Sequence, residues 1–158
     1  MKKVIAGSCG LLLTAWVIVT WASPAVGVTP TLIGRGTYEA FKVKSDNNFF
    51  EFEAEAKPAV DIVVRTHDYA IDGSTGWHTH PGPVFITVLE GTLTFYEVDD
   101  PTCTGKVLTA GEGYLDTGHG HLARNESGAP AKDVTVIIAP VGQAFRGELP
   151  APGPHCAF

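Results

Sequence analysis

The chain has 158 residues and a formal net charge of −6, with 44% hydrophobic and 18% charged residues. This length allows one domain with one ordinary core, and the composition is that of a globular protein, not a disordered one. No basic stripe is present, so nucleic acid is not expected as a partner.

The first 27 residues have the layout of a secretory signal. Lys2 and Lys3 precede an apolar run that is densest over 11–22, and small residues with a proline follow it. Residues 4–22 also come close to the roughly 20 that span a bilayer, so an uncleaved anchor is the alternative. We expect cleavage, because small and polar residues interrupt the run. The mature chain would then be secreted, periplasmic or at the cell surface, and it would not bind the membrane, since it becomes more acidic.

Short β-rich runs bounded by turn residues fill most of the remaining chain. With 18 glycines, 11 prolines and no long helical period, they predict an all-β sandwich or barrel. Loops are expected at 45–48 and 125–130, and the tail from Val141 is expected to pack on the surface or to be mobile. The expected strands lie at 49–55, 60–71, 84–90, 92–98, 106–110, 113–118, 119–125 and 132–140.

Two cysteines, Cys103 and Cys156, follow the N-terminal segment. In an exported chain such an even pair predicts a disulfide, here one that ties the C-terminal tail to an Asp-Asp-Pro loop. Two free thiols are the alternative. Neither cysteine lies in a Cys-x-x-Cys motif or next to the histidine clusters at 78–80 and 119–121, so a zinc finger is not expected.

Four of the six histidines form two His-x-His pairs. His78 and His80 share one face of an extended strand, and two imidazoles on one face can chelate a cation such as Zn, Cu, Fe or Ni. His119 and His121 repeat the spacing. On a neighbouring antiparallel strand, one of them would complete a three-nitrogen site with open positions. Solvated loop histidines are the alternative.

Both pairs lie in segments that resemble the motifs of the cupin family. The segment GSTGWHTHPGPVFITVLEG resembles the first motif, and DTGHGHLARN resembles the second, where His121 is followed by Asn125. The resemblance covers roughly residues 60–140 and is to small single-domain bacterial cupins, whose individual activities are mostly undefined.

The resemblance implies a single-domain double-stranded β-helix, or jelly-roll barrel. The expected organisation is a signal peptide or anchor at 1–27, the barrel at 28–140 with its motif core at 60–140, and a tail at 141–158.

The resemblance also implies a divalent transition metal, Fe, Mn, Cu, Ni or Zn, near the barrel mouth. Its ligands would be His78, His80 and His121. We expect Asn125 and Trp77 to lie around the metal ligands or at the pocket, with Trp77 packing at the mouth or flanking a ligand. His119 is a candidate second-shell donor, proton shuttle or catalytic residue, with a solvated loop histidine as the alternative.

Two positions depart from the family pattern. The first motif normally carries a glutamate where this chain has Val84 or Phe85, and Glu90 lies too far along the strand to replace it. The second motif has Asp116 or Thr117 in place of its usual proline. A metal without a protein carboxylate keeps its formal charge, so we expect an anionic small-molecule ligand or an activated water.

Three functions stay open at this level. The chain could be a metal-dependent enzyme such as a small-molecule oxygenase, a non-catalytic protein that binds a metal and a small ligand, or a metal-free structural cupin. His119 is the candidate catalytic group, because no other obvious base stands beside the motifs. His67 is expected to be a structural histidine within its strand. A homodimer is expected from the fold alone.

Overall fold

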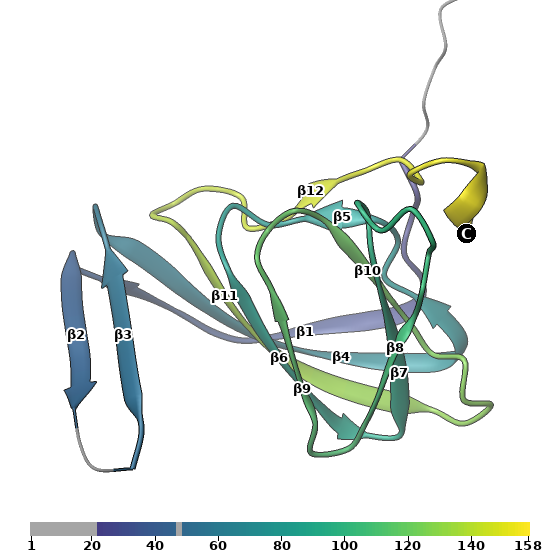
Figure 1. Ribbon diagram of the computed structural model, residues 1–158, viewed down its shortest axis with the longest axis horizontal. Helices are drawn as coiled ribbons and strands as arrows, with labels where there is room; N and C mark the ends of the chain where they lie inside the picture. Colours follow the sequence, from purple (N-terminus) through teal and green to yellow (C-terminus); the bar gives the residue numbers. More distant parts are fainter. Residues whose placement is uncertain (1–21, 47–48) are drawn as a thin grey trace, which may run out of the picture.

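The computed structural model describes residues 22–46 and 49–158, so the predicted signal or anchor lies mostly outside the described residues. These residues form the predicted all-β barrel (Figure 1). No helix in this part of the chain is long and apolar enough to cross a membrane. The strands are β1 Val26–Tyr38, β2 Phe41–Asp46, β3 Glu51–Ala56, β4 Val60–Ser74, β5 His78–Thr79, β6 Val84–Glu90, β7 Thr92–Glu97, β8 Lys106–Thr109, β9 Gly113–Asp116, β10 His121–Arg124, β11 Ala131–Pro140 and β12 Gly147–Glu148, followed by a 3₁₀ turn at Pro154–Cys156.

The barrel is one antiparallel sheet with two layers that join at the end of the long strand β4. One layer has the order β1–β4–β11–β6–β9, and the other has the order β12–β5–β10–β7–β8. The layers join where Arg124 of β10 pairs with Ser74 at the end of β4. β5, β12 and the start of β10 therefore meet at one end of the barrel (Figure 1).

The core follows from the alternation of side chains along the strands. Along β6, Val84, Ile86 and Val88 are buried, whereas the intervening Phe85 and Leu89 are exposed. β11 alternates buried with half-buried residues in the same way. The inward residues pack into one hydrophobic cluster, whose largest fully buried members include Phe95, Leu93 and Ile137.

β1 and β2 were not expected from the sequence. β1 is extended because it pairs with β4 along nearly its whole length, from Val26 opposite Ser74 to Tyr38 opposite Val60. It therefore begins inside the segment 1–27 that resembles a signal. β2 runs to Asp46, so part of the expected loop at 45–48 belongs to a strand.

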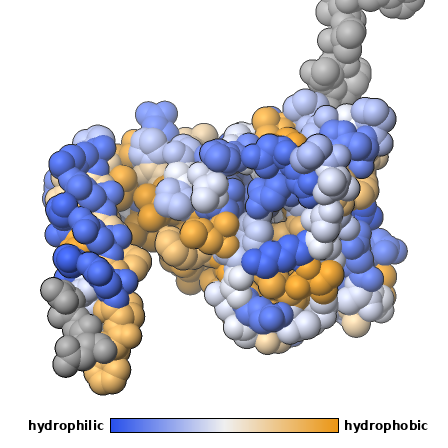
Figure 2. All heavy atoms as spheres, viewed as in Figure 1, coloured by the Kyte–Doolittle hydropathy of each residue, from blue (hydrophilic) through white to orange (hydrophobic). Residues whose placement is uncertain are grey.

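The hairpin of β2 and β3 is a separate two-stranded sheet that stands beside the barrel (Figure 1). Its charged residues pair across the strands, with Lys42 Nζ 2.8 Å from Glu53 Oε1 and Lys44 Nζ 2.8 Å from Glu51 Oε1. Its apolar residues line a groove of about 490 Å³ against the barrel, and Figure 2 shows apolar residues between the two parts.

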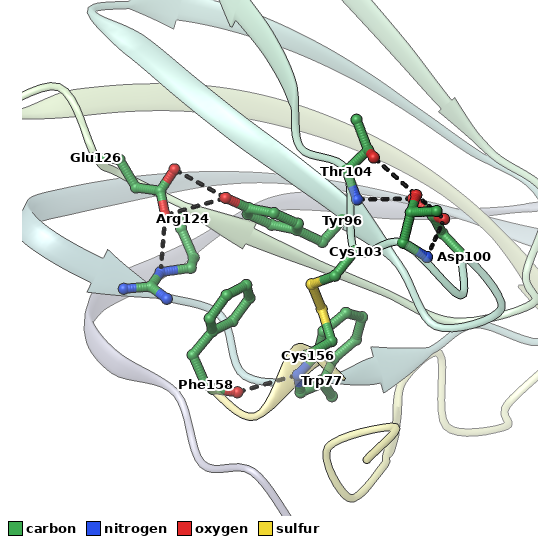
Figure 3. The surroundings of a disulfide bond; sticks show 10 residues. Trp77, Tyr96, Asp100, Cys103, Thr104, Arg124, Glu126, Cys156 and Phe158 are labelled. Atoms are coloured by element: carbon green, nitrogen blue, oxygen red, sulfur yellow. Dashed lines mark hydrogen bonds and ion pairs between the residues drawn. A yellow bond between two sulfur atoms is a disulfide. The ribbon is translucent and has the colours of Figure 1, made fainter. Parts of the chain in front are cut away.

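The C-terminal tail is built into the barrel end. β12 pairs with β5, and the backbone N–H of Leu149 donates to the carbonyl of Trp77 at 2.9 Å. Cys156 forms a disulfide with Cys103, and its Cα lies 5.5 Å from that of Cys103 (Figure 3). Trp77, Leu122 and Cys156 form a second buried cluster beside this disulfide. The tail therefore packs on the surface of the barrel end, which is one of the two alternatives expected from the sequence, and only Cys156 within 141–158 is buried.

Candidate metal centre

Three histidines from two strands converge at the end of the barrel. His78 lies in β5, His80 follows that strand, and His121 begins β10 directly opposite His78. One nitrogen from each ring lies within 4.8 Å of the others, and all three side chains are buried. This spacing could hold one metal ion, because three imidazole nitrogens can then reach a common centre.

Hydrogen bonds orient the first two rings. His78 Nδ1 lies 2.8 Å from the carbonyl oxygen of Gly76, and His80 Nδ1 lies 2.6 Å from the carbonyl oxygen of Phe145. A carbonyl only accepts, so each Nδ1 carries the hydrogen and each Nε2 keeps a free lone pair. This is the tautomer that metal-binding histidines normally have.

The third ring lies beside a buried carboxylate, although the two groups do not have the geometry of a hydrogen bond. His121 Nδ1 lies 3.2 Å from Asp116 Oδ2, and both side chains are almost fully buried. Burial raises the pKa of Asp116, but the neighbouring His121 and the backbone N–H of Gly118 outweigh burial and hold that pKa below its ordinary value. Asp116 is therefore an anion behind His121, an arrangement that increases the basicity of the opposite nitrogen.

The first two rings are neutral at physiological pH. Burial lowers the pKa of His78 far below its usual range, and the nearby His121 and Arg146 lower it further. Burial also lowers the pKa of His80 to about 4, although the hydrogen bond to Phe145 opposes this shift. Neutral imidazole is the metal-binding form, so the donor set fits a transition metal.

No carboxylate joins the three rings within residues 22–46 and 49–158. At the positions of the missing family glutamate, Val84 is fully buried in the core and Phe85 is half exposed on the outside. Glu90 is exposed at the last residue of β6 and does not belong to the cluster. Any ion held here would keep its positive charge uncompensated by a direct protein ligand.

A small inner cavity of about 20 Å³ adjoins the three histidines. His67, whose strand position predicts a structural histidine, lines this cavity, and its Nδ1 lies 2.7 Å from Asp133 Oδ1. The Tyr69 hydroxyl donates to the other Asp133 oxygen at 2.8 Å. Burial, with the Asp133 charge, raises the pKa of Tyr69 well above its ordinary value, so Tyr69 stays a donor.

Arg65 and Arg146 line the same cavity. Arg65 comes from β4, and Arg146 directly precedes β12. Sequence reasoning missed both, together with Tyr69 and Asp133. For Arg65, Tyr69 and Asp133 the only signal is that inward positions of a buried strand carry charged or hydroxyl groups, which normally need a partner. Arg146 lies outside the strands and has no such signal.

The structure does not bring His119 to the centre. Its side chain is 71% exposed, and its Nδ1 lies 3.7 Å from Asp99 Oδ2. His119 and His121 are two residues apart, so their side chains would point to the same side only if both residues lay in one continuous strand. Here β10 begins at His121, and Gly120 between them has a φ of 118°, which turns the chain.

Asn125 and Trp77 are buried but have structural contacts. Asn125 Nδ2 donates to the carbonyls of Ala70 and Ala129 at 3.0 and 2.7 Å, so Asn125 fixes the turn after β10. The Trp77 indole N–H donates to the carbonyl of Phe158 at 3.0 Å, and the ring packs under the tail (Figure 3). Trp77 is absent from the lining of the inner cavity.

Comparisons with known proteins agree with this fold. Residues 66–137 match the family model described as Cupin domain. No curated protein matches the sequence.

Several solved structures are similar to the chain. A cupin-2 domain protein from Rhodospirillum rubrum is 10% identical, with 82% of this chain and 72% of that chain covered at a TM-score of 0.52. A polyketide cyclase from Streptomyces resistomycificus is 16% identical, with 85% and 88% covered at a TM-score of 0.49. An uncharacterized conserved protein with a double-stranded beta-helix domain from Klebsiella pneumoniae is 22% identical, with 70% and 84% covered at a TM-score of 0.48.

At these identities the structural likeness concerns the fold. The match of residues 66–137 to the Cupin domain and the barrel topology agree on a cupin-like double-stranded β-helix fold.

Proposed function

We propose that this chain binds one divalent transition metal ion through His78, His80 and His121, and that the ion receives a small-molecule ligand. The observation that carries the proposal is the set of three buried rings whose Nδ1 atoms each face an oxygen at 2.6–3.2 Å. Because each Nδ1 faces an oxygen, each Nε2 keeps its lone pair available, and this arrangement favours metal binding over a purely structural role.

A small-molecule oxygenase is the catalytic form of this proposal. When bound, the metal would act as a Lewis acid or redox centre with positions open to a ligand. Among the residues of this chain, His67 is the best-placed base. Its Nδ1 lies 2.7 Å from Asp133 Oδ1, so Nε2 is the nitrogen that could exchange a proton, on a ring that lines the inner cavity. Tyr69 keeps Asp133 in place from the other side.

A non-catalytic protein that binds a metal and a ligand is the alternative. The small inner cavity favours it, because about 20 Å³ leaves room beside the histidines for roughly one water-sized group. Oxygen consumption by the metal-loaded protein in the presence of a bound ligand would favour the oxygenase. Tight ligand binding without turnover would favour the binding protein.

Export belongs to the same proposal. The N-terminal charged, apolar and small-residue layout supports export, and so does the Cys103–Cys156 disulfide, because disulfides persist in oxidising compartments. Mass spectrometry of the chain purified from an exporting host would locate its N-terminus. A full-length product that stays in the cytoplasm would refute export.

Metal analysis of the purified chain, without a histidine tag, tests the metal site. The parent should carry or take up about one equivalent of Fe, Mn, Cu, Ni or Zn, and His78→Ala/His80→Ala should take up almost none. His119→Ala is the matched control, because it removes an exposed histidine two residues from His121 and should keep full uptake. A folded parent that takes up none of these metals would overturn the proposal.

A further inference from the structure

Two cavities lie one behind the other at the barrel end. The outer cavity measures about 380 Å³, and the inner cavity beside the three histidines measures about 20 Å³. They share four lining residues, which are Arg65, His67, Thr75 and Arg146. Any molecule that reaches the histidines from the outer cavity must therefore pass these four side chains.

Arg65 contributes a positive charge that has no direct partner. Across the part of the chain that the structure describes, its guanidinium has no ion pair, and the guanidinium carbon lies 5.1 Å from the centre of the Phe145 ring. Burial lowers the pKa of Arg65 and the charge of Arg146 lowers it further, whereas the charge of Asp133 opposes this shift. Two guanidinium groups thus lie near each other in a partly buried site.

The nearby acids are occupied by other groups. Glu148 holds Arg146, with Oε1 2.5 Å from Nε and Oε2 2.8 Å from Nη2, and that nitrogen also donates to the carbonyl of Thr75 at 2.7 Å. Both oxygens of Asp133 accept from His67 and Tyr69. No carboxylate therefore neutralises Arg65 directly, and Arg146 is fixed in place.

A buried hydroxyl adds a second sign of a missing partner. Thr135 is 5% exposed and lines the inner cavity, and its Oγ1 has no hydrogen-bond partner among the described residues. Buried polar groups are normally satisfied by protein, water or ligand. The edge of the inner cavity thus carries the Arg65 guanidinium, which has no ion pair, and the Thr135 hydroxyl, which has no hydrogen-bond partner among the described residues.

We infer that Arg65, with Arg146 fixed beside it, binds the carboxylate of a small organic acid whose apolar body lies in the outer cavity. This inference rests on the proposed function, since the acid would be the ligand of the metal centre. The planar guanidinium of Arg65 matches a carboxylate in a two-bonded geometry. Val28 and Pro30, which follow the segment expected to be cleaved, line the outer cavity and suit an apolar body.

Butyrate is the probe, because it joins a carboxylate to a short apolar chain. Its binding is measured by ¹⁵N NMR titration of the metal-free and the zinc-loaded protein. Butyramide has the same shape without the charge, and inorganic phosphate tests a different oxyanion. Butyrate should shift the amides of Arg65, Thr75 and Arg146 saturably, whereas butyramide should not. Phosphate binding that is tighter and equally dependent on Arg65 would overturn the carboxylate assignment.

Variants separate the arginine from general charge effects. Arg65→Gln should weaken butyrate binding roughly tenfold or more, because it removes the charge. Arg65→Lys should weaken binding less, because lysine keeps the charge but lacks the paired N–H donors of the guanidinium. Lys132→Gln removes one positive charge from a residue outside both cavities and should change the affinity less than about twofold. Equal butyrate affinity in folded Arg65→Gln and parent would overturn the inference.

The two proposals fail in different ways. Arg65→Gln should still take up about one equivalent of zinc, since Arg65 is not one of the three clustered histidines. A parent that takes up no zinc refutes the metal site, and the metal-free titration then decides the arginine subsite alone. Zinc uptake with butyrate affinity independent of Arg65 refutes only the subsite.

Discussion

The C-terminal tail holds the first histidine pair in place, and the disulfide holds the tail. His78 pairs with Glu148 across β5 and β12, and His80 Nδ1 bonds to the carbonyl of Phe145. The tail then returns to the barrel through Cys156. We therefore predict that removing the disulfide lowers both the stability of the chain and its affinity for metal.

The perturbation is Cys103→Ser/Cys156→Ser, which leaves no unpaired partner thiol. The sequence separation of the two cysteines is 53 residues. For a loop of this length, the chain-entropy relation gives a loss of about 4 kcal/mol in the free energy of unfolding. His119→Ala is the matched control, because it changes an exposed residue near the same end of the barrel and keeps the disulfide.

Two assays measure the outcome. Urea unfolding of the metal-free proteins, followed by circular dichroism, should show the midpoint falling in the double variant and staying unchanged in His119→Ala. Zinc competition titration should show an affinity loss of roughly tenfold, because the carbonyl that orients His80 is held less firmly.

Either assay can refute the reasoning. A double variant that unfolds at the parent's midpoint would show that the disulfide does not restrict the unfolded chain in the way the loop length implies. A large loss of stability with unchanged zinc affinity would show that β12 and Phe145 hold the histidines without help from Cys156.

Three further predictions address the site and the turn beside it. Asp116→Asn should weaken zinc binding roughly tenfold or more while keeping the fold, because His121 loses the anion behind it, and an unchanged affinity in competition titration would contradict that role. The metal-free protein should lose stability as the pH falls from about 6.5 to 4, because His80 has a pKa of about 4 when folded and about 6.5 when unfolded, so the unfolded chain binds more protons in this range. Urea midpoints at pH 7 and 5 measure this loss, which should be smaller in His80→Gln. Asn125→Ala should destabilise the fold by about 2 kcal/mol without changing zinc stoichiometry, and a selective loss of zinc would instead assign it to the metal site.

The sequence predicted the parts of the site that depend on short-range spacing. His78 and His80 lie two residues apart at β5, so strand alternation places both rings on one side. His121 was reached through the resemblance of its segment to a cupin motif. The same spacing argument failed for His119, because Gly120 ends the regular chain direction before β10 starts.

The remaining parts depend on contacts between segments that are distant in sequence. β1 contains Gly27, Pro30, Gly34 and Gly36, which mask a strand pattern, and it is extended because β4 offers a long edge. Arg146 lies in a tail without periodicity, and only its pairing with Glu148 and the Thr75 carbonyl brings it to the cavity. No local pattern encodes such placements.

Charge balance links the metal centre to its ligand class. Three neutral rings would leave the charge of a divalent ion uncompensated, and Arg65 adds a further positive charge nearby. The acids of the site cannot offset this excess directly, because Asp116 faces the rear of His121 and Asp133 is held by His67 and Tyr69. An anion that enters from the outer cavity would meet the arginine first and the metal next. This chain has Val84 or Phe85 where the cupin motif carries a glutamate. The absence of that glutamate has a physical consequence: the ligand, and not the protein, would supply the negative charge at the ion.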